Sequence, residues 1–312
     1  MGFIRADYAA GCRRTHLRNN LLLCLNRTAQ SSIAASRRRL IANGILSGVL
    51  ILFGSVQSGA QPLKTAVFYG APMPVAALAH YDRVVVEADN FPAPPVFPAS
   101  TPQVFAYVSV GEAEGWRTSA SSLDEKLFLG TNQGWNSRIA DLTQRGWSDY
   151  LIETRMRALW DQGYRAFFLD TLDSYRIVVK DPDGQLRQTD ALVNIIHSIH
   201  RRFPGVRLLL NRGFEILPEV AHLAVGVVAE SLFQGWDAGT GTYVLVNEDG
   251  RNWLLAQLRT ANIRYRLPVT VIDYVAPDQP DLARDTARRI RALGFSAWVA
   301  TPSLNTLSAE PE

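Results

Sequence analysis

The stretch that decides the fold is Gly163-Tyr164-Arg165-Ala166-Phe167-Phe168-Leu169-Asp170, where a glycine precedes an almost wholly apolar run that ends in an acid. A short apolar run of this kind is typical of a parallel strand that is covered on both faces. A glycine at the end of the preceding helix permits the left-handed turn back into the strand. The stretch therefore predicts a helix followed by a buried parallel strand that presents a carboxylate at its end.

The same unit recurs along the chain. Gly205 and Gly294 again precede apolar runs, and the residues between the runs carry apolar side chains at helical spacing, as from Leu192 to Phe203. The predicted strands are residues 65–69, 83–87, 103–110, 165–170, 206–211, 225–230, 268–273 and 295–300. Eight βα units favour a single α/β domain with the (β/α)8 TIM-barrel fold over an open doubly wound sheet, which has fewer strands. No G-x-G-x-x-G motif follows the first strand, which disfavours a dinucleotide-binding fold.

The first sixty residues read as a leader. They contain eight Arg and one acid, Asp7, which gives this segment a net charge of +7. The basic residues 37–39, the apolar run 40–56 and the small residues 58–60 predict a signal peptide that is cleaved before Gln61. An uncleaved membrane anchor is the alternative, and the basic motif also resembles a twin-arginine signal. We expect a leader at 1–60, a barrel at 61–312, and a periplasmic or secreted protein.

Composition excludes several functions for residues 61–312. These residues hold 24 Lys+Arg and 28 Asp+Glu, so the positive excess of the whole chain lies in the leader and no nucleic-acid surface is expected. Both cysteines, Cys12 and Cys24, also lie in the leader, which excludes a disulfide, a thiolate metal site and a cysteine nucleophile from the barrel. His197 and His200 suit a helix face better than a metal site, so we expect no metal and no cofactor. Residues 181–184 and 247–250 predict turns rather than calcium loops.

Acidic residues stand at the ends of several predicted strands, where the chemistry of a barrel concentrates. Asp170 ends the fourth strand and Glu230 the sixth, and alternate strands contribute side chains to the same layer. With strands about 4.8 Å apart, inward-leaning side chains bring the two carboxyls to about 5 or 6 Å. Retaining glycosidases use about 5 to 5.5 Å and inverting ones about 6.5 to 9.5 Å. An aspartate in this position can instead cap a helix, but glutamate is not a preferred cap residue.

Five sequence blocks carry a family resemblance: YVSVGE at 107–112, GYRAFFLDTLDSY at 163–175, NRGFEILPE at 211–219, ESL and QGWD at 230–237, and IDYV at 272–275. In order, from about residue 66 to 307, the chain resembles the endo-α-1,4-polygalactosaminidases of glycoside hydrolase family 114. The resemblance implies a barrel that cleaves α-1,4 bonds in a partly deacetylated N-acetylgalactosamine exopolysaccharide of the Pel type. Asp170 and Glu230 match the family's strand-four aspartate and strand-six glutamate.

We predict a retaining, endo-acting hydrolase in which Asp170 is the nucleophile and Glu230 the general acid and base. Aromatic, amide and acidic residues near the strand ends are predicted to bind substrate, although a structural role suits the tyrosines and the amide equally well. They are Tyr69, Tyr107, Glu112, Asp173, Tyr175, Asn211, Trp236, Asp273, Tyr274 and Trp298, with Trp116 as a further candidate for stacking on sugar.

The expected partners are the polysaccharide and the exopolysaccharide export machinery, and the expected state is a monomer. Two other functions stay open. A non-catalytic carbohydrate-binding barrel would need the aromatic residues but neither Asp170 nor Glu230. A deacetylase would need a set of His and Asp metal ligands that the sequence does not offer.

Overall fold

The computed structural model describes residues 59–97, 102–117, 120 and 122–307, which belong to one unit of the chain. The predicted leader, apart from Gly59 and Ala60, lies outside the described residues. Among the described residues, no helix combines the length and the apolar character needed to cross a bilayer.

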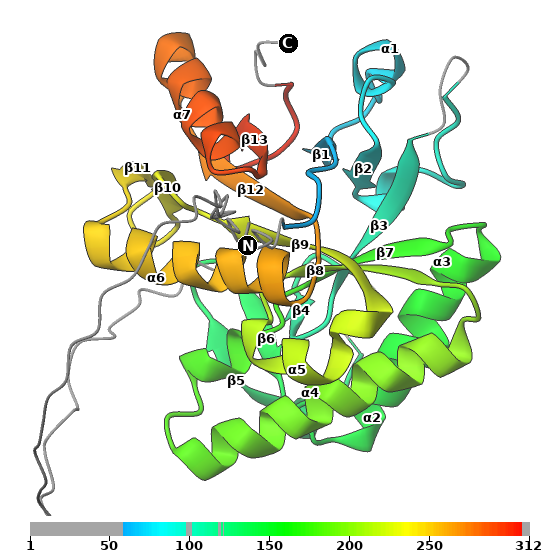
Figure 1. Ribbon diagram of the computed structural model, residues 1–312. Helices are drawn as coiled ribbons and strands as arrows, with labels where there is room; N and C mark the ends of the chain where they lie inside the picture. Colours follow the sequence, from blue (N-terminus) through cyan, green and yellow to red (C-terminus); the bar gives the residue numbers. More distant parts are fainter. Residues whose placement is uncertain (1–58, 98–101, 118–119, 121, 308–312) are drawn as a thin grey trace, which may run out of the picture. The chain divides into compact units, whose positions relative to one another are not determined.

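Eight parallel strands form the barrel, each hydrogen-bonded to the next (Figure 1). Their order is β1 (Thr65–Phe68), β2 (Arg83–Val86), β3 (Gln103–Ser109), β7 (Ala166–Asp170), β8 (Arg207–Asn211), β9 (Ala224–Glu230), β12 (Val269–Tyr274) and β13 (Ser296–Ala300). The two edge strands approach each other where the Thr65 amide donates to Ser296 Oγ at 3.4 Å, so the barrel is nearly closed. The predicted (β/α)8 fold is confirmed.

Two smaller sheets lie outside the barrel. Between β3 and β7, the strands β4 (Glu112–Glu114), β5 (Phe128–Asn132) and β6 (Ser137–Ala140) form an antiparallel sheet in the order β4-β6-β5. After β9, the strands β10 (Gln234–Asp237) and β11 (Thr242–Leu245) form a hairpin. Both insertions follow the carboxyl ends of barrel strands, which is where the loops of a barrel carry function.

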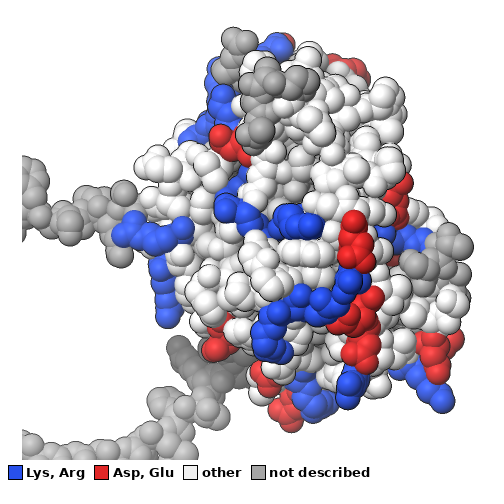
Figure 2. Space-filling model, turned by 90° about the vertical axis from the view of Figure 1, so that its right-hand side faces the viewer, with Lys and Arg blue, Asp and Glu red and all other residues white. Residues whose placement is uncertain are grey.

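Charged side chains of both signs lie next to one another on the surface that Figure 2 shows. Two exposed ion pairs of the described residues illustrate this mixing: Arg202 Nε lies 2.8 Å from Glu153 Oε1, and Arg157 Nε lies 2.9 Å from Asp161 Oδ2. Exposed pairs of this kind contribute little to folding stability, because water and salt screen them.

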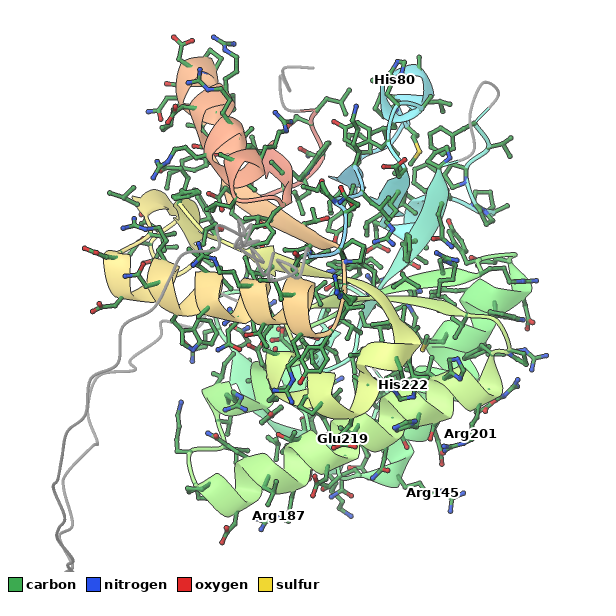
Figure 3. All side chains as sticks on the ribbon, in the orientation of Figure 1. His80, Arg145, Arg187, Arg201, Glu219 and His222 are labelled. Carbon is green, nitrogen blue, oxygen red and sulfur yellow. The ribbon has the colours of Figure 1, made fainter. Side chains whose placement is uncertain are left out.

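The longest helix, α4 (Pro182–Arg202), shows how sequence pattern sets the outer layer. Its apolar residues Leu192, Ile195 and Ile199 are buried, while Arg187 and Arg201 point outward (Figure 3). Helix α6 (Glu248–Arg259) precedes β12, and helix α7 (Pro280–Ala292) packs against β13. Shorter helical segments are α1 (Val75–Leu78), η1 (Ala88–Asn90), η3 (Glu125–Leu127), α2 (Arg145–Asp149), η4 (Tyr150–Met156), α3 (Arg157–Asp161), η5 (Ser174–Ile177), η6 (Phe214–Ile216), α5 (Leu217–Val220), η7 (Ala221–Leu223) and η8 (Thr260–Arg264).

Two predicted turns prove to be helix starts. Asp181 caps α4 by accepting the amide of Gly184 at 2.6 Å, and Asn247 caps α6 by accepting the amide of Gly250 at 2.7 Å. An acidic or amide side chain at this position satisfies an amide that has no partner inside the helix. The turn prediction was therefore too limited, because both stretches also continue into helices.

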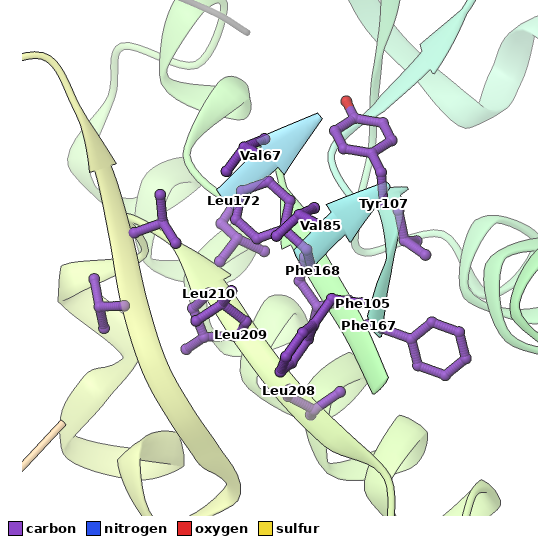
Figure 4. Close-up of a cluster of buried hydrophobic side chains, with 14 of the residues drawn as sticks. Val67, Val85, Phe105, Tyr107, Phe167, Phe168, Leu172, Leu208, Leu209 and Leu210 are labelled. Carbon is purple, nitrogen blue, oxygen red and sulfur yellow. The ribbon is translucent and has the colours of Figure 1, made fainter. Parts of the chain in front are cut away.

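The barrel core consists of apolar side chains from neighbouring strands (Figure 4). Val67, Val85, Phe105, Phe168 and Leu209 are each 0% exposed. Burying one such side chain stabilises a fold by about 1.5 to 3 kcal/mol. Tyr107 joins this cluster through its ring, and its hydroxyl points away from the other side chains (Figure 4). The core therefore ends in a polar layer above β3.

Candidate active site

Four polar side chains meet at the carboxyl ends of consecutive strands. Asp170 ends β7, Asn211 ends β8, Glu230 ends β9 and Tyr274 ends β12. The register pairs Glu230 with Ile272 and Asn211 with Val228, so these parallel strands end at the same rim. Asp170 is 2%, Asn211 5% and Glu230 7% exposed. The sequence-based expectation that the strand ends would gather carboxylates agrees with this placement.

Asn211 bridges the two carboxyl groups. Its Nδ2 donates to Asp170 Oδ1 at 2.6 Å and to Glu230 Oε1 at 3.0 Å. Both oxygens accept a hydrogen bond from the same nitrogen. The distance between them is therefore no more than the sum of the two bond distances, about 5.6 Å. This bound applies to the facing oxygens, Asp170 Oδ1 and Glu230 Oε1. The carboxyls therefore face each other at short range.

Glu230 lies where its neutral form is favoured. Burial raises its pKa above the ordinary value for glutamate, and the negative charge of Asp170 adds to this shift. Hydrogen bonds from Tyr274 and Asn211 oppose it in part. Burial and the nearby Glu230 also raise the pKa of Tyr274 well above its ordinary value, which keeps its hydroxyl as a donor to Glu230 Oε2. A buried carboxyl with a raised pKa suits a proton donor.

Tyr69 and Tyr107 stand beside this pair, with their ring centres 5.3 Å apart in an edge-to-face arrangement. Burial raises the pKa of both hydroxyls, and the charge of Asp170 raises it further. Among the described protein atoms, Tyr69 Oη, Asp170 Oδ2 and Asn211 Oδ1 are buried without a hydrogen-bond partner. Buried polar groups are normally satisfied, so these three atoms are available to hydroxyl or amine groups of a bound molecule.

The backbone next to the site adopts an unusual conformation. Thr171, which follows Asp170, has φ of 62°, and Arg212, which follows Asn211, has φ of 59°. Left-handed backbone is costly for a β-branched residue and clusters at functional sites. Thr171 Oγ1 accepts the amide of Gly111 at 2.8 Å, and a Cβ on Gly111 would lie 2.1 Å from the Thr171 carbonyl oxygen. Only glycine fits there, and this contact fixes the end of β7 against the end of β3.

Two of the predicted substrate-binding acids are buried and have protein groups as hydrogen-bond partners. Glu112 is 4% exposed, and it accepts Asn132 Nδ2 at 3.0 Å as well as the hydroxyl of Ser137, which links β4 to β5 and β6. Asp273 is 0% exposed, and its carboxyl accepts the amides of residues 232–234 at 2.6 to 2.9 Å. Burial raises the pKa of Asp273 to about 7. Their oxygens are already occupied, so these placements do not fit the predicted role in binding sugar.

Two predicted aromatic platforms also lie in the core. Tyr175 is 1% exposed, and its hydroxyl contacts Thr189 Oγ1 at 2.8 Å and Glu215 Oε1 at 3.0 Å. Trp298 is 0% exposed and packs edge-to-face with Tyr81 at 5.6 Å between ring centres. Neither ring presents a face to solvent, so the prediction that they stack on sugar does not fit the structure.

Asp173 and Trp236 keep some access to solvent. The carboxyl of Asp173 lies 3.4 Å from Arg212 Nε, and its side chain is 18% exposed. Trp236, on β10, is partly buried and packs edge-to-face with Tyr243 at 5.0 Å between ring centres. Both residues follow strands that end at the site, so a role in binding substrate stays a prediction for each.

The sequence did not predict a buried charge network beside Tyr107. Arg117, whose side chain is 5% exposed, contacts Glu87 Oε2 and Glu114 Oε2, each at 2.6 Å, and also pairs with Asp89. Arg155 contacts Asp89 Oδ1 at 2.6 Å. Burial raises the pKa of Glu114, and the charge of Arg117 and its hydrogen bond to Glu114 reduce this rise. Three acids near neighbouring strand ends were visible in the sequence, and their need for basic partners was the signal that could have identified this network.

No group of three or more His, Cys, Asp or Glu residues that could hold a metal ion occurs among the described residues. His80 lies beside α1, while His222 lies near α5 (Figure 3). His197 approaches His222, with 6.1 Å between ring centres, and not the active site.

Comparisons with known proteins identify the family of this chain. The model of glycoside-hydrolase family GH114 matches residues 59–311. The glycoside hydrolase domain of PelA from Pseudomonas aeruginosa is 37% identical over 80% of this chain and 98% of that domain, with a TM-score of 0.70. A variant of the same domain gives a TM-score of 0.69.

Ega3 from Aspergillus fumigatus, solved with galactosamine, is 14% identical over 81% of this chain and 96% of that chain, with a TM-score of 0.53, and supports the fold alone. No curated protein sequence matches the chain. The family match and the identity to the PelA domain both span the barrel. This chain therefore belongs to glycoside hydrolase family 114 and is a glycoside hydrolase.

Proposed function

We propose that this hydrolase cleaves α-1,4 bonds inside a partly deacetylated galactosamine polymer and retains the configuration of the anomeric carbon. The observation that carries the proposal is the bridge from Asn211 to both carboxyls. It supports a separation of no more than about 5.6 Å between the facing oxygens of the two carboxyls, whereas an inverting enzyme needs about 6.5 to 9.5 Å between its carboxyls to place a water between sugar and base.

In the first half-reaction, Glu230 donates its proton to the glycosidic oxygen. Asp170 Oδ2, which has no partner among the described protein atoms, attacks the anomeric carbon from the opposite side. The bond to the leaving sugar breaks, and its electron pair stays on the oxygen that Glu230 has protonated. The product is a covalent glycosyl-aspartate.

In the second half-reaction, the ionised Glu230 takes a proton from water, and the water oxygen attacks the anomeric carbon. The bond to Asp170 breaks, which restores both carboxyls to their starting states. Tyr274 and Asn211 hold Glu230 in place throughout, because each donates to a different oxygen of its carboxyl.

Galactosamine as the substrate unit is proposed from the resemblance to the polygalactosaminidases of this family. Residues 61–312 carry more acidic than basic residues, which favours a polymer with free amines. We further propose that residues 1–60 are a leader for export, that the barrel acts as a monomer on exopolysaccharide outside the cytoplasm, and that the export machinery is a partner. N-terminal sequencing of the exported protein tests the cleavage before Gln61.

The stereochemical test uses NMR on a defined α-1,4 galactosamine oligomer. The first-formed reducing end should be the α-anomer, which then mutarotates. A β-anomer that appears first would contradict retention, and an intact oligomer at high enzyme concentration would contradict the substrate.

A further inference from the structure

Trp116 is a large aromatic side chain that is exposed and yet held in place. It is 62% exposed, and the guanidinium of Arg117 lies 4.0 Å from the centre of its ring. Stacking of a guanidinium on one face of an indole is favourable. The opposite side of the ring is therefore the one that can receive a flat apolar surface.

Arg117 cannot easily move away from this position. Its guanidinium pairs with Glu87, Asp89 and Glu114, and its side chain is 5% exposed. Breaking a buried ion pair leaves an uncompensated charge, which is strongly unfavourable. The indole thus lies on a rigid support, and ordering it on binding costs little additional entropy.

The indole lies close to the active site. Arg117 is 5.8 Å from the ring centre of Tyr107, so the rings of Trp116 and Tyr107 are separated by no more than about 9.8 Å. The charge of Asp170 in turn affects the hydroxyl of Tyr107. Trp116 is therefore near the catalytic pair without touching it.

A second aromatic pair follows another strand of the barrel. Trp236 and Tyr243 belong to the hairpin that follows β9, whereas Trp116 follows β3 and β4. In the barrel order β3-β7-β8-β9, the strands that carry Asp170 and Asn211 lie between β3 and β9. The amides that Asp273 holds fix the start of this hairpin.

We propose that Trp116 is a sugar-stacking platform for a residue of the polymer away from the bond that is cleaved. The apolar face of a pyranose ring packs on the exposed indole, and the polar edges of the sugar stay in water. This inference rests on the proposed function, because it names a further subsite for the same substrate.

The test compares wild type with Trp116→Ala and Trp116→Phe on α-1,4 galactosamine oligomers of increasing length. Trp116→Ala should raise KM about 2- to 10-fold for long oligomers and the polymer. It should leave kcat and the kcat/KM of the shortest cleaved oligomer unchanged. Trp116→Phe should restore much of the loss, because it keeps an aromatic face.

Ile263→Ala is the matched control. Ile263 is 40% exposed, but it precedes β12 and so lies at the opposite end of the barrel. This variant should behave as wild type at every length. A second measurement does not depend on turnover. It compares polymer binding by Glu230→Gln with polymer binding by the double variant that also carries Trp116→Ala.

The outcomes separate this inference from the proposed function. If wild type neither cleaves nor binds the galactosamine polymer, both fail. If wild type cleaves it and Trp116→Ala shows no change, or an equal loss at all lengths, the platform is refuted and the proposed function stands.

Discussion

Replacing Asn211 by alanine tests the core of the proposed mechanism. The change removes the amide that donates to Asp170 and to Glu230 at 2.6 and 3.0 Å. A hydrogen bond to a charged group, here Asp170, contributes about 1.5 to 3 kcal/mol, and one to a neutral group, here protonated Glu230, contributes about 0.5 to 1.5 kcal/mol. Losing both bonds should therefore lower the free energy of unfolding by about 2 to 4.5 kcal/mol. A misplacement of the reacting groups by about 1 Å costs about 100-fold in rate, so kcat should fall by about that factor.

The pH profile of Asn211→Ala gives a readout that a general loss of stability would not change. The amide of Asn211 lowers the pKa of Glu230, although burial and Asp170 raise it overall. Removing the amide should therefore raise that pKa further. Glu230 acts in its protonated form in the first half-reaction, so the alkaline limb of the rate profile should move to higher pH.

Asn132→Ala is the matched control for this experiment. Asn132 is also a buried amide that donates to a buried glutamate, Glu112, at 3.0 Å. This variant should lose stability but keep the alkaline limb of wild type. A variant of Asn211 with wild-type kcat and an unchanged alkaline limb would refute the positioning role that we assign to this residue.

Three other predictions follow from single contacts. Asp170→Asn and Glu230→Gln should each lower kcat by at least about 1,000-fold in a reducing-end assay while circular dichroism stays unchanged, and near-normal turnover would contradict the assignment. Burial raises the pKa of Asp273 to about 7 in the folded protein, whereas an aspartate in an unfolded chain has a pKa of about 3.9. The folded state therefore binds this proton more tightly, and the free energy of unfolding should fall as the pH rises from about 4 to about 7. Asp273→Asn should remove that dependence of Tm on pH, and parallel curves for both proteins would contradict it. Gly111→Ala should reduce both stability and kcat, because the new Cβ meets the Thr171 carbonyl, whereas Gly146→Ala meets only the side chain of Leu127 at 3.1 Å and should change neither by much.

The sequence predicted the barrel well because two local signals, an apolar run and a glycine before it, indicate its strands. The run from Ala166 to Leu169 is apolar without interruption, and Gly163 before it has φ of 105°, as a residue that turns back from a helix should. The positions of Asp170 and Glu230 followed from the same pattern, since a residue that ends a parallel strand lies at the rim. The ends of these strands can thus be predicted from local sequence.

The sequence could not predict which hydrogen-bond partner each polar group at the rim has. Asp273 ends a strand much as Asp170 does, yet its carboxyl accepts amides from a loop 39 to 41 residues away in sequence. Trp298 and Trp116 are the same residue type, but one is 0% and the other 62% exposed. These differences depend on packing between distant segments, which spacing along the chain does not encode.

The position of Asn211 explains why an amide serves better here than a cation. The carboxyls stand on alternate strands, β7 and β9, so a side chain on β8 is placed to contact both. An arginine or lysine there would hold two carboxylates more strongly, but its positive charge would lower the pKa of Glu230. That would favour the ionised form and remove the proton that the leaving sugar needs. A neutral side chain with two donors fixes the separation and preserves the raised pKa, which is the combination that a nucleophile beside a general acid requires.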